Sequence, residues 1–133
     1  MAVVSNETIP VASETDVVNV RRRVREVAGK LGFSLVDQTK VVTAASELAR
    51  NTLLYGGGGV MELATLNGPR VGIRLCFEDK GPGIPDIQLA LRDGFTSGSG
   101  LGLGLGGAKR LVSEFDIISR VGEGTKITVT RWK

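Results

Sequence analysis

Three short polar or glycine-rich patches contain the residues of this chain that could do chemistry. They span residues 47–51, 78–85 and 100–107. The first offers a carboxylate and an amide oxygen, the second an acidic side chain at a turn, and the third a backbone with little side-chain cover. Together they supply what an ATP site requires: oxygens for a metal and a proton, an acceptor for a base, and amide donors for phosphates.

Glu47 and Asn51 are four residues apart in a segment with helical periodicity, so both side chains point to one helix face. A carboxylate and an amide oxygen can begin a Mg²⁺ site, which keeps waters and phosphate oxygens as its other ligands. Such a carboxylate can also accept a hydroxyl proton during phosphoryl transfer. Alternatively, Glu47 pairs with Arg50 at the surface and Asn51 lies at a fraying helix end.

Asp79 follows a strand-like segment, and Gly81 and Gly83 flank a proline that forces a turn. An aspartate at this position can accept a hydrogen bond from an exocyclic amine, and the glycines allow a planar base to approach the backbone. An ordinary turn begun by aspartate is the alternative. Thr125, which follows a Gly-Glu-Gly turn, either offers its hydroxyl to a ligand or only closes a hairpin.

The third patch contains Gly100, Gly102 and Gly104 ahead of a helical segment, and its amide groups could hold an anion. It is not a Walker A loop, because Lys109 is followed by Arg110 and no Gly-Lys-Ser/Thr occurs. It also lacks the preceding strand and βαβ unit of a dinucleotide fingerprint. A flexible glycine hinge is the alternative.

Apolar periodicity predicts the elements that must position these patches. Two helices are expected to begin after Ser13 and Ser34, each with an aspartate three residues further on. Their predicted buried stripes are Val17, Val20, Val24, Val27 and Leu31 in the first helix, and Val41, Ala44, Ala45, Leu48 and Thr52 in the second.

The remaining elements complete one domain over residues 1–133. A short strand is expected within residues 1–12, the two helices over 14–31 and 34–55, strands over 60–66 and 71–77, a short helix over 87–92, a helix over 105–115, and strands over 117–121 and 125–132. This order predicts an α/β two-layer sandwich, in which helices cover one face of a mixed, antiparallel-rich sheet.

Composition excludes several classes of function. The chain has 133 residues, a net charge of +3, no histidine and the single Cys76, so neither a Cys/His zinc site nor an internal disulfide is expected. Its few aromatic residues are not interleaved with basic ones, which argues against nucleic acid binding. The basic run at 21–25 is either a solvated helix face or a docking surface for an acidic protein. Without an apolar signal core or membrane span, a cytoplasmic protein is expected.

Residues 46–51, 81–87 and 122–125 together resemble the motifs of the GHKL superfamily, the Bergerat ATP-binding fold of gyrase, Hsp90, histidine kinases and MutL. Within it, the chain is most similar to the small bacterial anti-sigma-factor-type serine/threonine kinases that switch partners in stress signalling. The resemblance extends over essentially the full length. It implies a single HATPase-type kinase domain with ATP and Mg²⁺ as cofactors.

The resemblance also implies a role for each matching residue. Glu47 would be the catalytic base, and Asn51 would hold Mg²⁺. Asp79 would bind the adenine amino group in a pocket shaped by Gly81 and Gly83, and Thr125 would support the adenine. Residues 86–100 would form the ATP lid, and the phosphates would be contacted by Gly100, Gly102 and Gly104.

The family relationship implies partners as well. Such kinases phosphorylate a serine or threonine of a STAS-domain protein of the stressosome, and then leave it to activate a PP2C-type phosphatase. Because the chain has no histidine and no phosphotransfer helices, a self-contained histidine kinase is excluded. Two alternatives stay open: a nucleotide-gated anti-sigma-type module that sequesters a partner with little catalysis, and the ATPase domain of a split histidine kinase.

Overall fold

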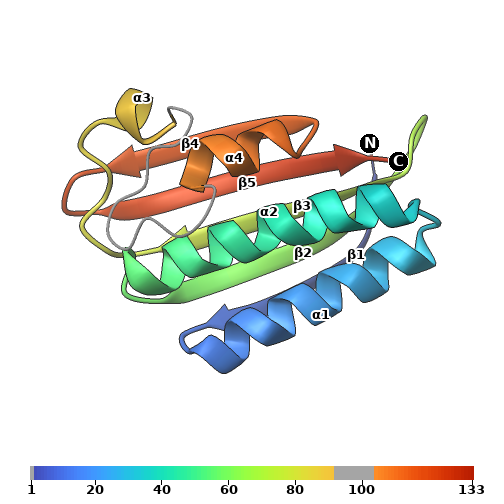
Figure 1. Cartoon of the computed structure of the whole chain (residues 1–133), viewed down its shortest axis with the longest axis horizontal. Helices are drawn as coiled ribbons and strands as arrows, with labels where there is room; N and C mark the ends of the chain where they lie inside the picture. Colours follow the sequence, from blue (N-terminus) through green and yellow to red (C-terminus); the bar gives the residue numbers. More distant parts are fainter. Residues whose placement is uncertain (1, 92–103) are drawn as a thin grey trace.

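The computed structural model describes residues 2–91 and 104–133, with one five-stranded sheet and one layer of helices (Figure 1). Along the chain the elements are β1 (Ala2–Val11), α1 (Glu14–Lys30), α2 (Leu35–Leu54), β2 (Gly59–Asn67), β3 (Gly72–Asp79), α3 (Ile87–Ala90), α4 (Gly104–Arg110), β4 (Glu114–Arg120) and β5 (Gly124–Trp132).

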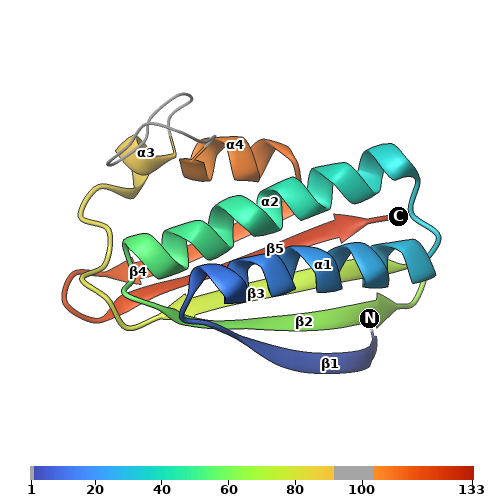
Figure 2. The same cartoon turned by 60° about the horizontal axis from the view of Figure 1, so that its bottom comes forward.

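The strands lie in the order β1-β2-β3-β5-β4, and each of the four pairings is antiparallel. Helices α1, α2 and α4 lie over one face of this sheet, and the other face is left without helices in the described part of the chain (Figure 2). This arrangement confirms the predicted two-layer sandwich with an antiparallel-rich sheet. None of the described helices has the length and apolar character needed to cross a membrane.

Side-chain caps explain where α1 and α2 begin. The Ser13 hydroxyl accepts from the Asp16 backbone N–H at 3.1 Å, and the Ser34 hydroxyl accepts from that of Asp37 at 3.1 Å. Both caps satisfy an amide that has no partner within its helix. Gly32, in the turn between the helices, has a φ of +84°, which a glycine adopts without strain. The predicted starts and ends of both helices are therefore confirmed to within one residue.

The helix layer and the inner face of the sheet share one hydrophobic core. The predicted buried stripes of both helices are confirmed, except that Leu31 is only partly buried. The sheet contributes Met61, Leu63, Ile73, Leu75, Phe77, Ile127 and Val129. At the rim, Arg23 Nε donates to Glu7 Oε1 at 2.6 Å, an interaction that raises the pKa of Arg23 and joins α1 to β1.

The predicted helix over 105–115 is wrong at its C-terminal end. Helix α4 stops at Arg110, and residues from Glu114 onward form β4. The Ser113 N–H donates to the Thr130 carbonyl at 2.8 Å, so pairing with β5 begins there and replaces the helix that the local sequence favours. The alternation of half-buried Phe115, Ile117 and Ser119 with exposed neighbours was the strand signal in this segment.

One end of the sandwich collects the termini of five elements. The C-terminal end of α2, the start of β2, the end of β3 and the β4–β5 turn all lie there, and the N- and C-termini of the chain lie at the opposite end (Figures 1 and 2). Two of the three predicted chemical patches, residues 47–51 and 78–85, reach this end.

Candidate nucleotide-binding site

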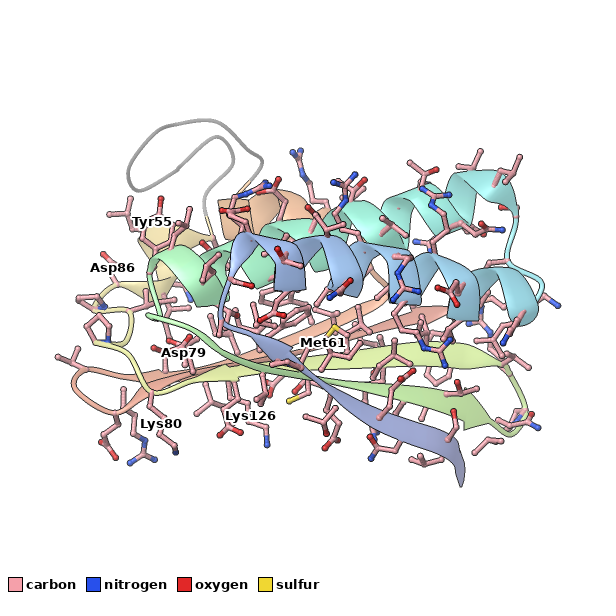
Figure 3. All side chains as sticks on the ribbon, turned by 90° about the horizontal axis from the view of Figure 1, so that it is seen from below. Tyr55, Met61, Asp79, Lys80, Asp86 and Lys126 are labelled. Atoms are coloured by element: carbon pink, nitrogen blue, oxygen red, sulfur yellow. The ribbon has the colours of Figure 1, made fainter. Side chains whose placement is uncertain are left out.

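A row of four residues crosses the sheet at this end. Gly59 of β2 faces Asp79 of β3, Asp79 faces Thr125 of β5, and Thr125 faces Ser119 of β4. Because strand side chains alternate between faces, Asp79 and Thr125 share the inner face with Phe77 and Ile127, which are buried two residues away. The row therefore points toward the helix layer, and Figure 3 shows Asp79 between the sheet and the helices.

The end of α2 lies directly over Asp79. A Cβ added at Gly56, just after the helix, would overlap the Asp79 side chain, and one added at Gly81 would lie 2.6 Å from the Gly56 carbonyl oxygen. The Gly81 N–H donates to Asp79 Oδ1 at 2.9 Å, which fixes the carboxylate. No described residue donates a hydrogen bond to Asp79 Oδ2, so this oxygen retains its capacity to accept one.

The turn after Asp79 packs against the β4–β5 hairpin. Gly83 has a φ of +78°, and a Cβ there would overlap the Arg120 carbonyl. The Gly122 N–H donates to the Pro82 carbonyl at 2.8 Å. Gly124 has a φ of +109° and passes so close to the Asp79 carbonyl that a Cβ has no room. Gly83 in the turn after Asp79 and Gly124 just before Thr125 are thus required by close backbone packing.

Glu47 and Asn51 lie one turn apart on α2, and both are partly buried. Within the described residues, neither side chain has a hydrogen-bond or ion-pair partner, and the alternative Glu47–Arg50 ion pair does not form. Asn51 is joined to the Asp79 end through its backbone, because its carbonyl accepts from the Gly56 N–H at 3.1 Å. A carboxylate and an amide oxygen are thus left with their full acceptor capacity.

The oxygens of Glu47 and Asn51 suit a magnesium ion whose other ligands come mainly from a nucleotide. In the described residues, no cluster of three or more His, Cys, Asp or Glu side chains could form a metal site built by the protein alone. Mg²⁺ commonly takes only one or two protein oxygens and completes its octahedron with phosphate oxygens and waters. The Asn51 amide oxygen is a suitable single ligand of this kind.

The predicted phosphate-binding glycines are only partly described. Gly100 and Gly102 lie outside the described residues, as does most of the predicted lid over 86–100. Gly104 is the first residue of α4 and has a φ of +68°. At the near end of the predicted lid, Asp86 caps α3 by accepting from the Leu89 N–H at 3.0 Å.

Two residues of the site were missed from the sequence. Gly56 follows the second predicted helix and is not marked by any motif, although it is the residue that packs against Asp79. Ser119 was not singled out, yet its hydroxyl lies 2.8 Å from Thr125 Oγ1 and accepts from the Ile84 N–H at 2.8 Å. Only its inward position in the alternation of β4 could have pointed to it.

A shallow hollow of about 180 Å³ adjoins this row and extends over charged side chains of the helix-free face. Asp79, Gly124 and Thr125 border it, and the rest of its lining comes from Ile118 and from charged side chains of both signs: Glu78, Lys80, Arg120, Glu123 and Lys126. In Figure 3, Lys80 and Lys126 extend away from the helices, on the side of the sheet opposite Asp79. The hollow therefore shares Asp79, Gly124 and Thr125 with the row, but no residue of α2 lines it, so it does not include the Glu47 and Asn51 acceptors.

Substituting Gly56 with alanine should lower the affinity for ATP about tenfold or more, because the added methyl group displaces the Asp79 carboxylate. Isothermal titration with Mg-ATP measures the effect. Gly57→Ala is the matched control: its φ of +76° costs about 1 kcal/mol of stability, but its Cβ meets nothing within 4 Å. Equal losses of ATP affinity in both variants would mean that binding depends on the conformation of the loop after α2 and not on the contact between Gly56 and Asp79.

Comparison with known proteins agrees with this geometry. Residues 36–133 match the family described as histidine kinase-, DNA gyrase B-, and HSP90-like ATPases. The chain is 45% identical over 125 residues to the serine/threonine-protein kinase RsbT of Bacillus subtilis, and the match covers 93% of this chain and 94% of RsbT.

Solved structures show the same fold. The RsbU and RsbW domains of a Mycobacterium tuberculosis protein match with a TM-score of 0.68 and 26% identity, over 97% of this chain and 32% of that one. The mycobacterial sensor histidine kinase MprB matches with a TM-score of 0.57 and 19% identity, over 96% and 97% of the two chains, and supports the fold alone. From its sequence, its fold and its close homology to RsbT, this chain belongs to the family of histidine kinase-, DNA gyrase B- and HSP90-like ATPases.

Proposed function

We propose that the chain is a Mg-ATP-dependent protein serine/threonine kinase of a bacterial stress-signalling partner switch. The observation that carries this proposal is the 45% identity to a serine/threonine-protein kinase over 94% of that kinase's length. The candidate site supports it, because the acceptors of α2 and the Asp79 turn lie at one end of the same domain.

The base of ATP would lie against the row across the sheet. Asp79 Oδ2 accepts from the exocyclic amine of adenine, while Gly81 and Gly124 let the backbone approach the ring closely. Thr125, which is only 8% exposed, lies beside Asp79 and supports the same edge of the base. Gly100, Gly102 and Gly104 are proposed to meet the phosphates through their amide groups, in the manner of other anion-binding backbones.

Phosphoryl transfer needs positioning and charge stabilisation more than covalent help from the protein. Glu47 is proposed to accept the proton of the attacking serine or threonine hydroxyl, because its carboxylate is partly buried and has no partner among the described residues. Asn51 would hold Mg²⁺, which when bound neutralises negative charge on the phosphate oxygens. The absence of histidine from the whole chain is consistent with a hydroxyl acceptor on another protein.

The proposed substrate is a STAS-domain protein of the stressosome, and the proposed downstream partner is a PP2C-type phosphatase that the released kinase activates. Because ATP is an intracellular metabolite, the proposed location is the cytoplasm. Incubating the chain with Mg-ATP and candidate STAS-domain proteins, followed by intact-mass spectrometry, tests the activity. A phosphoryl increment on one of them is expected, and it should disappear after treatment with a PP2C-type phosphatase.

The contrary result would be stable binding of a partner, such as a sigma factor, with no transfer of phosphate to any candidate. That outcome would replace the kinase with a nucleotide-gated binding module. Transfer to a histidine of a separate chain would favour the ATPase domain of a split histidine kinase.

A further inference from the structure

The hydroxyl of Ser119 joins three parts of the candidate site. It accepts from the Ile84 backbone N–H at 2.8 Å, lies 2.8 Å from Thr125 Oγ1 and donates to the Gly124 carbonyl at 3.3 Å. Ser119 is on the edge strand β4, so it connects the turn after Asp79 with the β5 residue beside Asp79. Among the described residues, no other side chain is hydrogen-bonded to both of these segments.

The number of protons limits how the hydrogen bonds of this network can run. A serine hydroxyl has one proton to donate and two lone pairs that can accept. One lone pair of Ser119 accepts from Ile84, and its proton can go to the Gly124 carbonyl at 3.3 Å or to Thr125 Oγ1 at 2.8 Å. All three contacts are satisfied together only when the Ser119 proton goes to Gly124 and Thr125 donates its own proton to the remaining lone pair of Ser119.

In this fully satisfied arrangement, Thr125 Oγ1 presents lone pairs, and not a proton, to the inner face of the sheet. Asp79 Oδ2 faces that side too, and an ionised carboxylate only accepts. Directly opposed residues of an antiparallel pair have their Cβ atoms about 4.5–5.5 Å apart. Two acceptors on neighbouring strands suit a base edge that carries an amine with two protons, directly or through a water.

We infer that Ser119 is a positioning residue that sets the specificity of this site for a 6-amino purine over a 6-oxo purine. It does so by holding Thr125 as an acceptor beside Asp79. This inference rests on the proposed ATP-binding function. Removal of the Ser119 hydroxyl leaves Thr125 free to rotate and donate its proton to a carbonyl oxygen at position 6 of the base.

The test compares the affinities of Ser119→Ala for Mg-ATP and Mg-ITP, which differ at position 6 of the base. Loss of one hydrogen-bonded contact in the network should lower ATP affinity about 3- to 10-fold. Affinity for ITP should fall by less or rise, so the ATP-to-ITP ratio should drop about threefold or more. Isothermal titration measures both dissociation constants on the same preparation.

Two further variants separate specificity from stability. Ser113 accepts from the Trp132 backbone N–H at 3.1 Å, at the other end of the same β4–β5 pair, so Ser113→Ala is the matched control and should keep the wild-type ratio. Ser119→Thr retains the hydroxyl and should keep the wild-type ratio of ATP to ITP affinity. Circular dichroism and thermal unfolding of each variant identify any that fail to fold. If Ser119→Ala is one of them, Ser119→Thr, which keeps the hydroxyl, is compared with the wild type instead.

The outcomes are distinct. A ratio that is unchanged in Ser119→Ala, with wild-type protein that binds ATP, would overturn the role of Ser119 and leave the proposed kinase intact. A ratio that falls equally in Ser113→Ala would assign the effect to general loosening of the sheet and would also overturn it. Wild-type protein that binds neither nucleotide would overturn both this inference and the proposed function.

Discussion

Replacing Glu47 with alanine should lower the rate of phosphoryl transfer by about 10²–10⁴-fold, the usual contribution of a positioned general base. The Glu47 carboxylate is partly buried and has no partner among the described residues, so it contributes little to the fold and is available to accept a proton. ATP affinity should change little, because the proposed contacts with the base lie on β3 and β5.

Single-turnover assays with radiolabelled ATP and a phosphorylatable STAS-domain protein measure this rate. Glu47→Gln keeps the size of the side chain and should show a similar loss, since the amide cannot serve as the base. Glu62→Gln, on the exposed, helix-free side of β2, is the matched control and should retain wild-type activity. Wild-type turnover by Glu47→Gln would remove this residue from the mechanism.

Replacing Asp79 with asparagine should weaken ATP binding about 10- to 100-fold, as expected for loss of a hydrogen bond to a charged acceptor. The amide oxygen can still accept from the Gly81 N–H, so the turn is retained. The amide nitrogen would replace the second oxygen and place donor against donor at the adenine amine. The rate at saturating ATP should fall much less than the affinity.

Titration with a non-hydrolysable ATP analogue gives the affinity without turnover. Asp116→Asn makes the same chemical change at an exposed position of β4 and should bind the analogue as the wild type does. If Asp79→Asn also binds with wild-type affinity, Asp79 does not recognise the base.

The fold could be predicted largely from patterns within single elements. The valines of α1 and the caps at Ser13 and Ser34 fixed two helices, because periodicity and capping are local properties of the chain. The segment after Arg110 could not be predicted in this way. Its strand is stabilised by pairing with β5, which is a contact between elements and leaves only a weak trace of alternation in the sequence.

In the candidate site too, residues marked by local sequence could be predicted, and residues that act through contacts with distant segments could not. Glu47 and Asp79 were found because acidic residues in polar or glycine-rich surroundings are visible along the chain. Gly56 and Ser119 were missed because each matters through a contact with a distant segment: Gly56 with Asp79, and Ser119 with Ile84. Such roles are decided by the strand order and register, which a single sequence does not specify.

The central claim is that one pocket, between the end of α2 and the Asp79–Thr125 row, holds the nucleotide. Backbone amide chemical-shift mapping by NMR, with a non-hydrolysable ATP analogue and Mg²⁺, tests it most directly. The largest shifts should fall on Asn51, Gly56, Gly81 and Thr125, with Lys126 on the neighbouring helix-free face moving less. Shifts centred on the hollow around Lys80 and Lys126, or no shifts at saturating analogue, would contradict the account.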